Sequence, residues 1–404
     1  MLHVMFLIED GSYRYDTRVR REAKTLQEAG IRVSVVSPAY EGEPLRDVID
    51  GVEYWGYRKP ALGEGFWGHI AEYASSLGHQ TVLTFRVDRH ARIDAIHAAN
   101  PPDLAWLVAL PYRLRRGVKF VFDHHDLVPE LFEERFGKGP MLALVRWMER
   151  QNLALADHVI ATNESFKHVA IRRGRRKPEE VTVVRNGPDL RDFPPTAPDP
   201  AIRRLGRIVV GYLGNMNPQD GIGGFIDMAR ILVKERGRTD VGFVMIGAGD
   251  SFEELQKKRD ESGLRDAITM TGRMRWGPEL RAALSATDIC VQPDPPGALN
   301  DRSTMVKTME YMALGRPVVA FDLKETRVTG GDAITFASPP TPEALADAVE
   351  ALADDTARRQ HLGALGRERV ESDLGWHVQA KKLLSVYERL FPGALRSERP
   401  RKAS

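Results

Sequence analysis

Short apolar runs alternate with amphipathic helical stretches along this chain, and the alternation occurs twice. In the first half, Leu2–Ile8 is expected to form a buried strand, and Tyr15–Gly30 a helix capped by Asp16 or Thr17 and stopped by Gly30. Further strands are expected at Ile31–Ser37, Ala95–Ala98, Lys119–Phe122, His158–Ala161 and Val181–Val184. Strands separated by helices pair in parallel, so the pattern predicts a doubly wound α/β sheet.

A proline-rich stretch at residues 193–200 separates the first repeat from the second. After it, strands are expected at Ile208–Leu213, Gly242–Ile246, Ile268–Thr271, Ile289–Gln292 and Val318–Ala320. The chain has 404 residues, whereas single cores stop growing near about 250–300 residues. The sequence therefore predicts two Rossmann-like α/β domains, residues 1–200 and 201–374, that face each other across a cleft. Residues 375–404 are expected to add a helix, Gly375–Phe391, that packs back toward the N-terminal domain, and a basic disordered tail, Arg396–Ser404.

The composition excludes several classes of protein. The formal net charge is +2, from 58 basic and 56 acidic side chains, so no single-sign field favours a nucleic-acid partner. Cys290 is the only cysteine, which excludes an internal disulfide framework and a cysteine-rich zinc site. No window approaches the ~20 apolar residues of a membrane span, and the apolar start meets Glu9 too soon for a signal peptide. We expect a cytoplasmic protein, and the sequence does not indicate its oligomeric state.

The end of the first strand argues against a dinucleotide enzyme. Such an enzyme would carry Gly-x-Gly-x-x-Gly at this place. Here the sequence reads Glu-Asp-Gly-Ser-Tyr-Arg-Tyr-Asp, with Gly11 as its one glycine. A dehydrogenase is therefore disfavoured.

Residues 300–320 carry the most informative segment. Ser303 is expected to cap a helix from Thr304 to Leu314, with Gly315 as its stop, and the free amides at the helix start suit an anion. Lys307 and Glu310 are three residues apart and share a face. A lysine there suits a phosphate, and a carboxylate one turn further suits a ribose diol. The spacing alone is equally compatible with a surface salt bridge beside a core stripe of methionines.

Several segments, in order over nearly the whole chain, resemble family 4 glycosyltransferases, which are retaining enzymes of the GT-B fold. Lys307–Ala320 resembles the donor-binding segment of this family, and Phe122–Glu130 its central N-domain motif. The other matching segments are Asp16–Ala23 with Gly30, Arg185–Asp189, Gly211–Asn215 and Ile246–Asp250.

The resemblance implies that the chain transfers a sugar from a nucleoside diphosphate donor, with UDP-hexose or UDP-N-acetylhexosamine favoured, and with retained anomeric configuration. The C-terminal domain would hold the nucleotide, with Glu310 on the ribose, and His125 would touch the donor hexose near the reacting carbon. Other donor-side residues would be Ser303, Thr304, Asp301, Gly214, Asn215, Gly249, Arg273 and Met274. Acceptor-side residues would be Gly11, Asp16, Arg18 and Glu130, and Glu130 is also open to a helix-capping role.

The sequence departs from the family pattern at two places. The first carboxylate of the Glu-x7-Glu pair should lie eight residues before Glu310, where this chain has Arg302. Three alternatives are open: Asp301 substitutes for it, the backbone amides of residues 300–304 contact the sugar hydroxyls alone, or Arg302 instead approaches the pyrophosphate. The loop 214–222 lacks the cations of many relatives, so Lys307 and Arg302, with the amides of Gly214 and Asn215, are expected to stabilise the departing diphosphate.

No metal and no cofactor are expected. His124 and His125 are adjacent on an extended strand and so point to opposite faces, which makes them poor joint ligands. No Asp-x-Asp follows a strand to suggest a metal-dependent glycosyltransferase. In the same-face mechanism by which the family is usually described, the departing phosphate oxygen accepts the acceptor proton, so the protein supplies position and electrostatics.

Basic clusters in the N-terminal domain leave peripheral membrane contact open. They comprise Arg18/Arg20/Arg21/Lys24, Arg113/Arg115/Arg116/Lys119 and Arg172/Arg173/Arg175/Arg176/Lys177. Such clusters contact anionic headgroups at the inner face of a membrane or are simply solvated. The acceptor stays unidentified, as a small molecule, a lipid-linked compound or a polysaccharide precursor. Two rival functions also stay open: a nucleotide-sugar epimerase or hydrolase, and a non-catalytic nucleotide-sugar-binding module.

Overall fold

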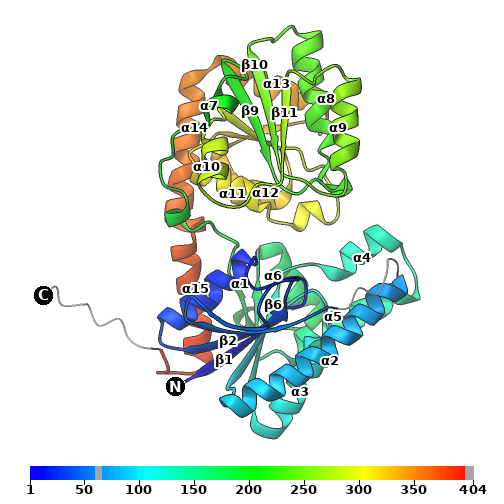
Figure 1. Ribbon diagram of the computed structural model, residues 1–404, viewed down its shortest axis with the longest axis vertical. Coiled ribbons are helices and arrows are strands. Elements are labelled where there is room, and N and C mark those ends of the chain that lie inside the picture. The colour runs from blue at the N-terminus through cyan, green and yellow to red at the C-terminus, as the bar shows by residue number, and fades with distance from the viewer. Residues whose placement is uncertain (60–65, 396–404) are drawn as a thin grey trace, which may run out of the picture. The chain divides into compact units, whose positions relative to one another are not determined.

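The computed structural model describes residues 1–59 and 66–395, and the chain divides into two compact units. Unit 1 comprises Met1–Arg185 and the chain from Gln379 onward, and unit 2 comprises Asn186–Val378. Each unit is built on one sheet with helices packed against it (Figure 1). The expected tail, Arg396–Ser404, lies outside the described residues.

Unit 1 contains an eight-stranded sheet with the order β3-β4-β2-β1-β5-β6-β7-β8. All neighbouring strands are parallel except β3 and β4. The strands are β1 (His3–Leu7), β2 (Arg32–Pro38), β3 (Arg46–Ile49), β4 (Val52–Tyr57), β5 (Ala95–Ala99), β6 (Lys119–His124), β7 (His158–Ala161) and β8 (Val181–Val183). The helices are α1 (Thr17–Glu28), α2 (Phe66–His90), α3 (Ala105–Arg116), α4 (Val128–Phe136), α5 (Pro140–Leu155), α6 (Glu164–Gly174) and most of α15 (Trp376–Leu390).

Unit 2 contains a six-stranded, all-parallel sheet with the order β11-β10-β9-β12-β13-β14. The strands are β9 (Ile208–Leu213), β10 (Val241–Ile246), β11 (Ile268–Gly272), β12 (Ile289–Gln292), β13 (Val318–Phe321) and β14 (Ile334–Ala337). The helices are α7 (Pro200–Arg203), α8 (Gly223–Arg230), α9 (Phe252–Glu261), α10 (Pro278–Ser285), α11 (Val306–Ala313), α12 (Lys324–Gly330), α13 (Pro342–Asp354) and α14 (Thr356–Arg369). The expected doubly wound α/β class is confirmed for both units.

Both faces of the unit 2 sheet are covered, which explains its continuous apolar strands. Val209 and Val210 are consecutive on β9 and face opposite sides. Val210 belongs to a core cluster with Phe225 of α8 and Leu345 of α13. Val209 belongs to a second cluster that includes residues of α10 and α11. Periodicity cannot separate such strands from buried helices, whereas their length and the glycines around them can.

The start of α1 settles which residue caps it. The Asp16 carboxylate accepts a hydrogen bond from the Val19 amide at 2.9 Å, so Asp16, and not Thr17, is the N-cap. The antiparallel pair β3–β4 was not predicted from the sequence. A signal for it was present, because Asp50 and Gly51 have φ values of 52° and 80°, and an Asp-Gly pair between two strands is typical of a tight hairpin.

The unit boundary lies at Arg185–Asn186, whereas the sequence analysis placed the domain boundary at residue 200. The proline-rich stretch packs within unit 2, because Phe193 and Ile202 belong to one of its core clusters. The Asp199 amide also donates to the Ala282 carbonyl at 2.9 Å. The end of α15 belongs to unit 1, where Tyr387 is fully buried.

The strand order of each unit reverses direction at one point. In unit 1 the reversal lies between β1 and β5, and in unit 2 it lies between β9 and β12. Loops that follow two such strands diverge, and they leave a crevice at the carboxyl ends where ligands bind in open α/β sheets. The two reversal points therefore define where to look for functional residues. Within the described residues, none of the helices has the length and apolar character needed to cross a membrane.

Candidate functional site

A buried ion pair lies at the reversal point of unit 2. Asp294 follows β12, and both of its carboxylate oxygens accept hydrogen bonds from Lys307 Nζ, at 2.9 and 3.0 Å. The Asp294 side chain is fully buried and that of Lys307 is 12% exposed. The Lys307 ammonium also lies 5.0 Å from the centroid of the Tyr212 ring. Lys307 was predicted from its motif, whereas Asp294 lies in no recognised motif and was not predicted.

The helix that carries Lys307 starts later than expected. Helix α11 begins at Val306 with Met305 as its N-cap, and no side chain caps it. The predicted cap at Ser303 is wrong, because the Ser303 hydroxyl donates to the Leu299 carbonyl at 2.9 Å. Ser303 instead ends a short 3-10 turn, Asn300–Arg302. The expected stop is present, since Gly315 follows the helix with a φ of 66°.

Donor-side candidates gather around the start of α11. Lys307 is in the first turn and Glu310 is one turn further, half-buried. Thr304 lies just before the helix, and Asp301 and Arg302 are in the preceding 3-10 turn. All of them are partly accessible to solvent. The structure therefore brings the predicted ribose, sugar and phosphate residues onto one segment, beside the Asp294–Lys307 pair.

Close backbone packing explains the glycines that follow β9 and β10. A Cβ on Gly247 would lie 1.9 Å from the Gly214 carbonyl oxygen, and one on Gly249 would lie 2.6 Å from the Met216 backbone. The Gly214 amide donates to the Ile246 carbonyl at 3.1 Å. The predicted contribution of that amide to a phosphate site is therefore corrected, because the amide is already paired within the sheet. Asn215 follows it and is exposed.

Two further donor-side candidates follow β11. Arg273 is exposed directly after the strand, and Met274 is half-buried against a core cluster of unit 2. Arg273 thus lies at the carboxyl edge of the same sheet, at the end of β11 rather than at the reversal point.

A hollow of ≈ 210 Å³ lies at the reversal point of unit 1. Asp10 and Gly11 line it after β1, Asn100 lines it after β5, and His125 and Asp126 line it after β6. The predicted acceptor-side residues Gly11 and Asp16 are both in its wall. His125 is the one predicted catalytic residue that lines it, with a side chain that is 15% exposed.

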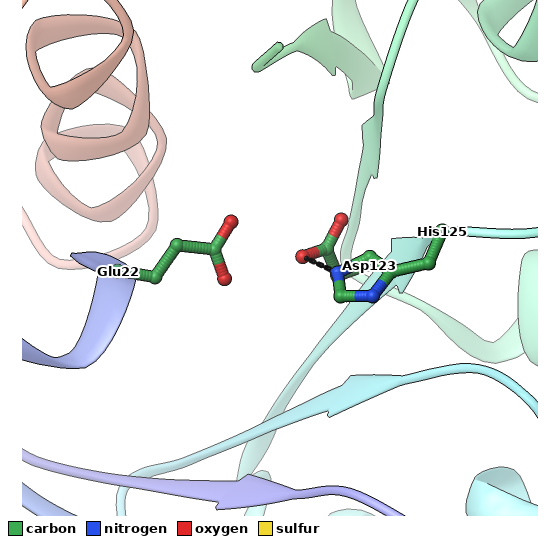
Figure 2. Close-up of side chains that lie close together, drawn as sticks. All are labelled: Glu22, Asp123 and His125. Carbon is green, nitrogen blue, oxygen red and sulfur yellow. Dashed lines mark hydrogen bonds and ion pairs between the residues drawn. The ribbon is translucent and has the colours of Figure 1, made fainter. Parts of the chain in front are cut away.

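A buried charge cluster lies behind His125, built on the guanidinium of Arg18. Arg18 donates to both carboxylate oxygens of Asp123, at 2.8 and 3.0 Å, and to His125 Nε2 at 2.8 Å. It pairs with Glu22 at 3.1 Å, one turn further along α1. Figure 2 shows Glu22 on α1 directed toward Asp123 and His125, with the hydrogen bond between the last two drawn. Arg18 also donates to the Val184 carbonyl at 2.8 Å.

The cluster shifts the pKa values of its two carboxyl groups, Asp123 and Glu22, in opposite directions. Burial alone would raise the pKa of Asp123, but the charge of Arg18 and the hydrogen bonds around it hold that pKa well below its usual range. Burial raises the pKa of Glu22 well above its usual range, and the charge of Arg18 offsets this only in part. Asp123 is therefore the charged partner of Arg18, and Glu22 favours its protonated form.

The same three side chains offer donor atoms for a metal. Oxygen or nitrogen atoms of Glu22, Asp123 and His125 lie within 4.8 Å of one another. The Arg18 guanidinium already contacts all three of them. A metal ion would have to displace a buried cation that these groups already bind, so this donor set fits arginine and does not fit a metal.

Arg18 and Glu130 have different surroundings from those predicted. Arg18 is 6% exposed and lies within the cluster, so its predicted places on the acceptor surface and in a headgroup-binding cluster are corrected. The Glu130 carboxylate accepts a hydrogen bond from Arg173 Nη1 at 3.0 Å, and the same nitrogen pairs with the buried Glu149. Glu130 is therefore a member of an ion network between α4, α5 and α6.

Other basic side chains of the N-terminal clusters have carboxylate partners. Arg20 pairs with Asp50, Arg116 with Asp88, and Lys119 with Asp157, at 2.7, 2.6 and 3.2 Å. These pairs neutralise part of the charge that the sequence presents as basic runs.

Two Rossmann-like units, each with polar side chains at the reversal point of its sheet, define the GT-B class of fold. Solved structures confirm this class. Sucrose-phosphate synthase from Thermosynechococcus elongatus has a TM-score of 0.76 at 18% identity and covers 97% of this chain and 99% of its own. Anabaena HepE, solved in complex with UDP and glucose, has a TM-score of 0.71 at 16% identity, and the match covers 96% of this chain and 100% of HepE.

Sequence comparison gives the family. The profile described as Glycosyltransferase Family 4 matches residues 16–192, and the one described as Glycosyl transferases group 1 matches residues 207–355. The chain is 28% identical over 301 residues to the α-maltose-1-phosphate synthase of Mycolicibacterium smegmatis. The aligned region covers 68% of this chain and 74% of that protein. The chain belongs to the family 4 glycosyltransferases and is a retaining glycosyltransferase.

The buried cluster generates a first prediction. Replacing Arg18 by Met leaves Asp123 buried without its counter-charge, and removal of one partner from a buried pair costs about 3–5 kcal/mol. The free energy of unfolding from urea denaturation should fall by this amount at neutral pH. The deficit should shrink as the pH is lowered, because the buried Asp123 of the variant then takes up a proton, whereas Arg18 keeps the pKa of Asp123 in the wild type well below its usual range.

Arg20→Met is the matched control, since it removes an exposed pair from the same helix and should cost about 0–1 kcal/mol. Equal losses for the two variants, or a deficit for Arg18→Met that does not change with pH, would contradict the role given to the buried cluster.

Proposed function

We propose that this enzyme transfers a hexosyl or N-acetylhexosaminyl group from a UDP-sugar to a hydroxyl group of its acceptor. The observation that carries the proposal is the segment at the reversal point of unit 2, where Lys307 and Glu310 lie one turn apart on α11 beside Asp294. A cation and a carboxylate at this spacing match a diphosphate and a ribose diol. That HepE was solved with UDP supports the choice of nucleotide.

The donor would be held chiefly by unit 2. Glu310 accepts hydrogen bonds from the ribose hydroxyls, and Lys307 and Arg302 stabilise the diphosphate. Thr304 and Asp301 lie on the same segment and contact the sugar hydroxyls in place of the family's first carboxylate. Ser303 joins them through its backbone, because its hydroxyl is committed to Leu299. Asn215, Gly249 and Arg273 border this site. They follow β9, β10 and β11, respectively.

The reaction breaks the bond between the anomeric carbon and the diphosphate oxygen and forms a bond from the acceptor oxygen to the same face of that carbon. The acceptor proton passes to the departing phosphate oxygen. His125 Nε2 lies 2.6 Å from an Asp123 carboxylate oxygen and 2.8 Å from Arg18 Nε, so these two side chains orient the ring. The protein contributes position and electrostatic stabilisation of the leaving group.

Product analysis separates this proposal from its rivals. The enzyme is incubated with UDP-glucose or UDP-N-acetylglucosamine and candidate acceptors, and products are identified by NMR. Transfer gives an α-linked product only when an acceptor is present. Hydrolysis or epimerisation without an acceptor would favour the rival enzyme, and nucleotide-sugar binding without any product would favour a binding module.

Lys307 and Glu310 should affect different kinetic constants. Removal of one preorganised charged donor from a developing negative charge costs about 10²–10³-fold in turnover, so Lys307→Ala should lower kcat by this factor. Glu310→Gln should mainly weaken UDP binding, by about 1.5–3 kcal/mol for a charged hydrogen bond. Steady-state kinetics and calorimetric titration with UDP measure the two effects.

The burial of Asp294 requires a companion variant. Lys307→Ala alone leaves Asp294 buried without a partner, whereas Lys307→Met combined with Asp294→Asn removes both charges. Lys257→Ala, at an exposed lysine of α9, is the control and should be neutral. Normal turnover of the double variant would mean that the diphosphate binds elsewhere. If Arg302→Ala were inactive at the same time, the diphosphate would be assigned to the 3-10 turn that carries Arg302.

Metal independence is a further part of the proposal. The Arg18 guanidinium takes the place that a metal ion would occupy among Glu22, Asp123 and His125. Lys307 and Arg302 stabilise the charge of the diphosphate. The transfer rate should therefore be unchanged in excess EDTA. Loss of activity that Mg²⁺ or Mn²⁺ restores would contradict this and would return the unit 1 cluster, or Asp126, to consideration as a metal site.

A further inference from the structure

The hollow at the reversal point of unit 1 has an acidic wall. Asp10, Asp16 and Asp126 all line it, and none of its lining residues within the described part of the chain is a lysine or an arginine. One carboxylate oxygen of Asp16 already accepts a hydrogen bond from the Val19 amide, because Asp16 caps α1. Arg18, which lies close by in the sequence, donates into the buried cluster behind His125.

Two of these carboxylates accept no hydrogen bond from the described residues. No hydrogen bond or ion pair reaches the side chain of Asp10 or of Asp126 from the described residues, although the Asp126 backbone is bound at both its amide and its carbonyl by Asn100. Limited solvation, together with the neighbouring charge of Asp126, raises the pKa of Asp10 to about 6. Asp10 is exposed and Asp126 is half-buried, and a partly desolvated carboxylate gains most from a ligand that donates hydrogen bonds or brings positive charge.

Aromatic side chains complete the hollow. Tyr15 and Tyr40 both line it, and their rings stack with centroids 5.7 Å apart at an angle of 27°. They are 62% and 52% exposed, so both rings are accessible to a ligand. Gly11 lies beside them, and a Cβ there would be 3.6 Å from the Tyr40 hydroxyl. Carboxylates beside aromatic faces suit a ring that carries hydroxyl or ammonium groups.

We infer that the acceptor group that enters this hollow is a sugar or cyclitol ring that presents hydroxyl or ammonium donors and carries no phosphate. The inference rests on the proposed transferase function and specifies its acceptor chemistry. A phosphate ester would bring negative charge to within a few ångströms of Asp10 and Asp126, and no cation in the described wall of the hollow would offset the repulsion. Hydroxyl or ammonium groups would pair with the same two carboxylates.

The test uses three matched probes: glucosamine, glucose and glucose 6-phosphate. Their dissociation constants for the enzyme saturated with UDP are measured by NMR titration at pH 7.5. Glucosamine and glucose should bind at least about tenfold more tightly than glucose 6-phosphate, since like charges about 4 Å apart at a protein surface cost more than the 1.4 kcal/mol of a tenfold change. Equal or tighter binding of glucose 6-phosphate, or no binding of glucosamine and glucose, would overturn the inference.

Variants assign the selectivity to this hollow. Asp126→Asn and Asp10→Asn should each narrow the preference for glucosamine over glucose 6-phosphate several-fold. Asp266→Asn, at an exposed carboxylate of unit 2, changes the net charge equally and should leave the preference unchanged. A preference that both Asp10→Asn and Asp126→Asn retain in full would overturn the inference, and two variants guard against the failure of one to fold.

Turnover of UDP-glucose and UDP-N-acetylglucosamine in the same samples keeps the two proposals apart. Turnover with a preference for glucose 6-phosphate would contradict the acceptor chemistry alone. Glucosamine preference without any donor turnover would contradict the transferase function and leave the chemistry of the hollow in place.

Discussion

The guanidinium of Arg18 determines the arrangement of charged side chains in unit 1. It lies among Asp123, Glu22 and His125 and reaches the Val184 carbonyl, so one side chain of α1 connects the ends of β6 and β8. A buried carboxylate is costly unless it is paired and hydrogen-bonded. Asp123 meets that condition only through Arg18 and its histidine neighbours. The orientation of the His125 ring at the edge of the hollow depends on this pairing.

The two units use the same topological device for different chemistry. Each places polar side chains where its strand order reverses, since the loops that follow the two central strands diverge there. In unit 2 the crevice carries a lysine held by a buried aspartate, which suits phosphate. In unit 1 the corresponding hollow carries carboxylates and tyrosines, which suit hydroxyl and ammonium groups. The chemical contrast between the two reversal points supports the proposed division of donor and acceptor between the units.

Much of the fold could be predicted from the sequence because the repeated strand–helix pattern is long and regular. All eleven expected strands match strands of the structure to within two residues at each end, as Leu2–Ile8 does to His3–Leu7 and Val181–Val184 does to β8. The hairpin β3–β4 was not predicted because its first strand is short and exposed, and so lacks the apolar run that marks a buried strand. Ser303 was a plausible cap by type, but the chain forms a 3-10 turn before it, and the helix begins three residues later.

The candidate site was less predictable because its key contacts join distant parts of the chain. Lys307, Glu310 and His125 stand in recognisable motifs, whereas Asp294 and Asp123 acquire their importance only through partners 13 and 105 residues away. Arg18 was expected on the acceptor side and in a basic run, whereas the fold buries it among carboxylates. Sequence patterns identify the residue types that suit a reaction, but the pairing of buried charges depends on tertiary structure.

A double-mutant cycle with Arg18→Met and Asp123→Asn tests the central claim most directly. The catalytic efficiency kcat/KM and the free energy of unfolding are measured for the wild type, both single variants and the double variant. If the pair acts as one unit that holds His125, the losses should be strongly non-additive, with a coupling energy of about 2–3 kcal/mol, near the upper end for contacting residues. Losses that add to within about 0.5 kcal/mol would contradict the account.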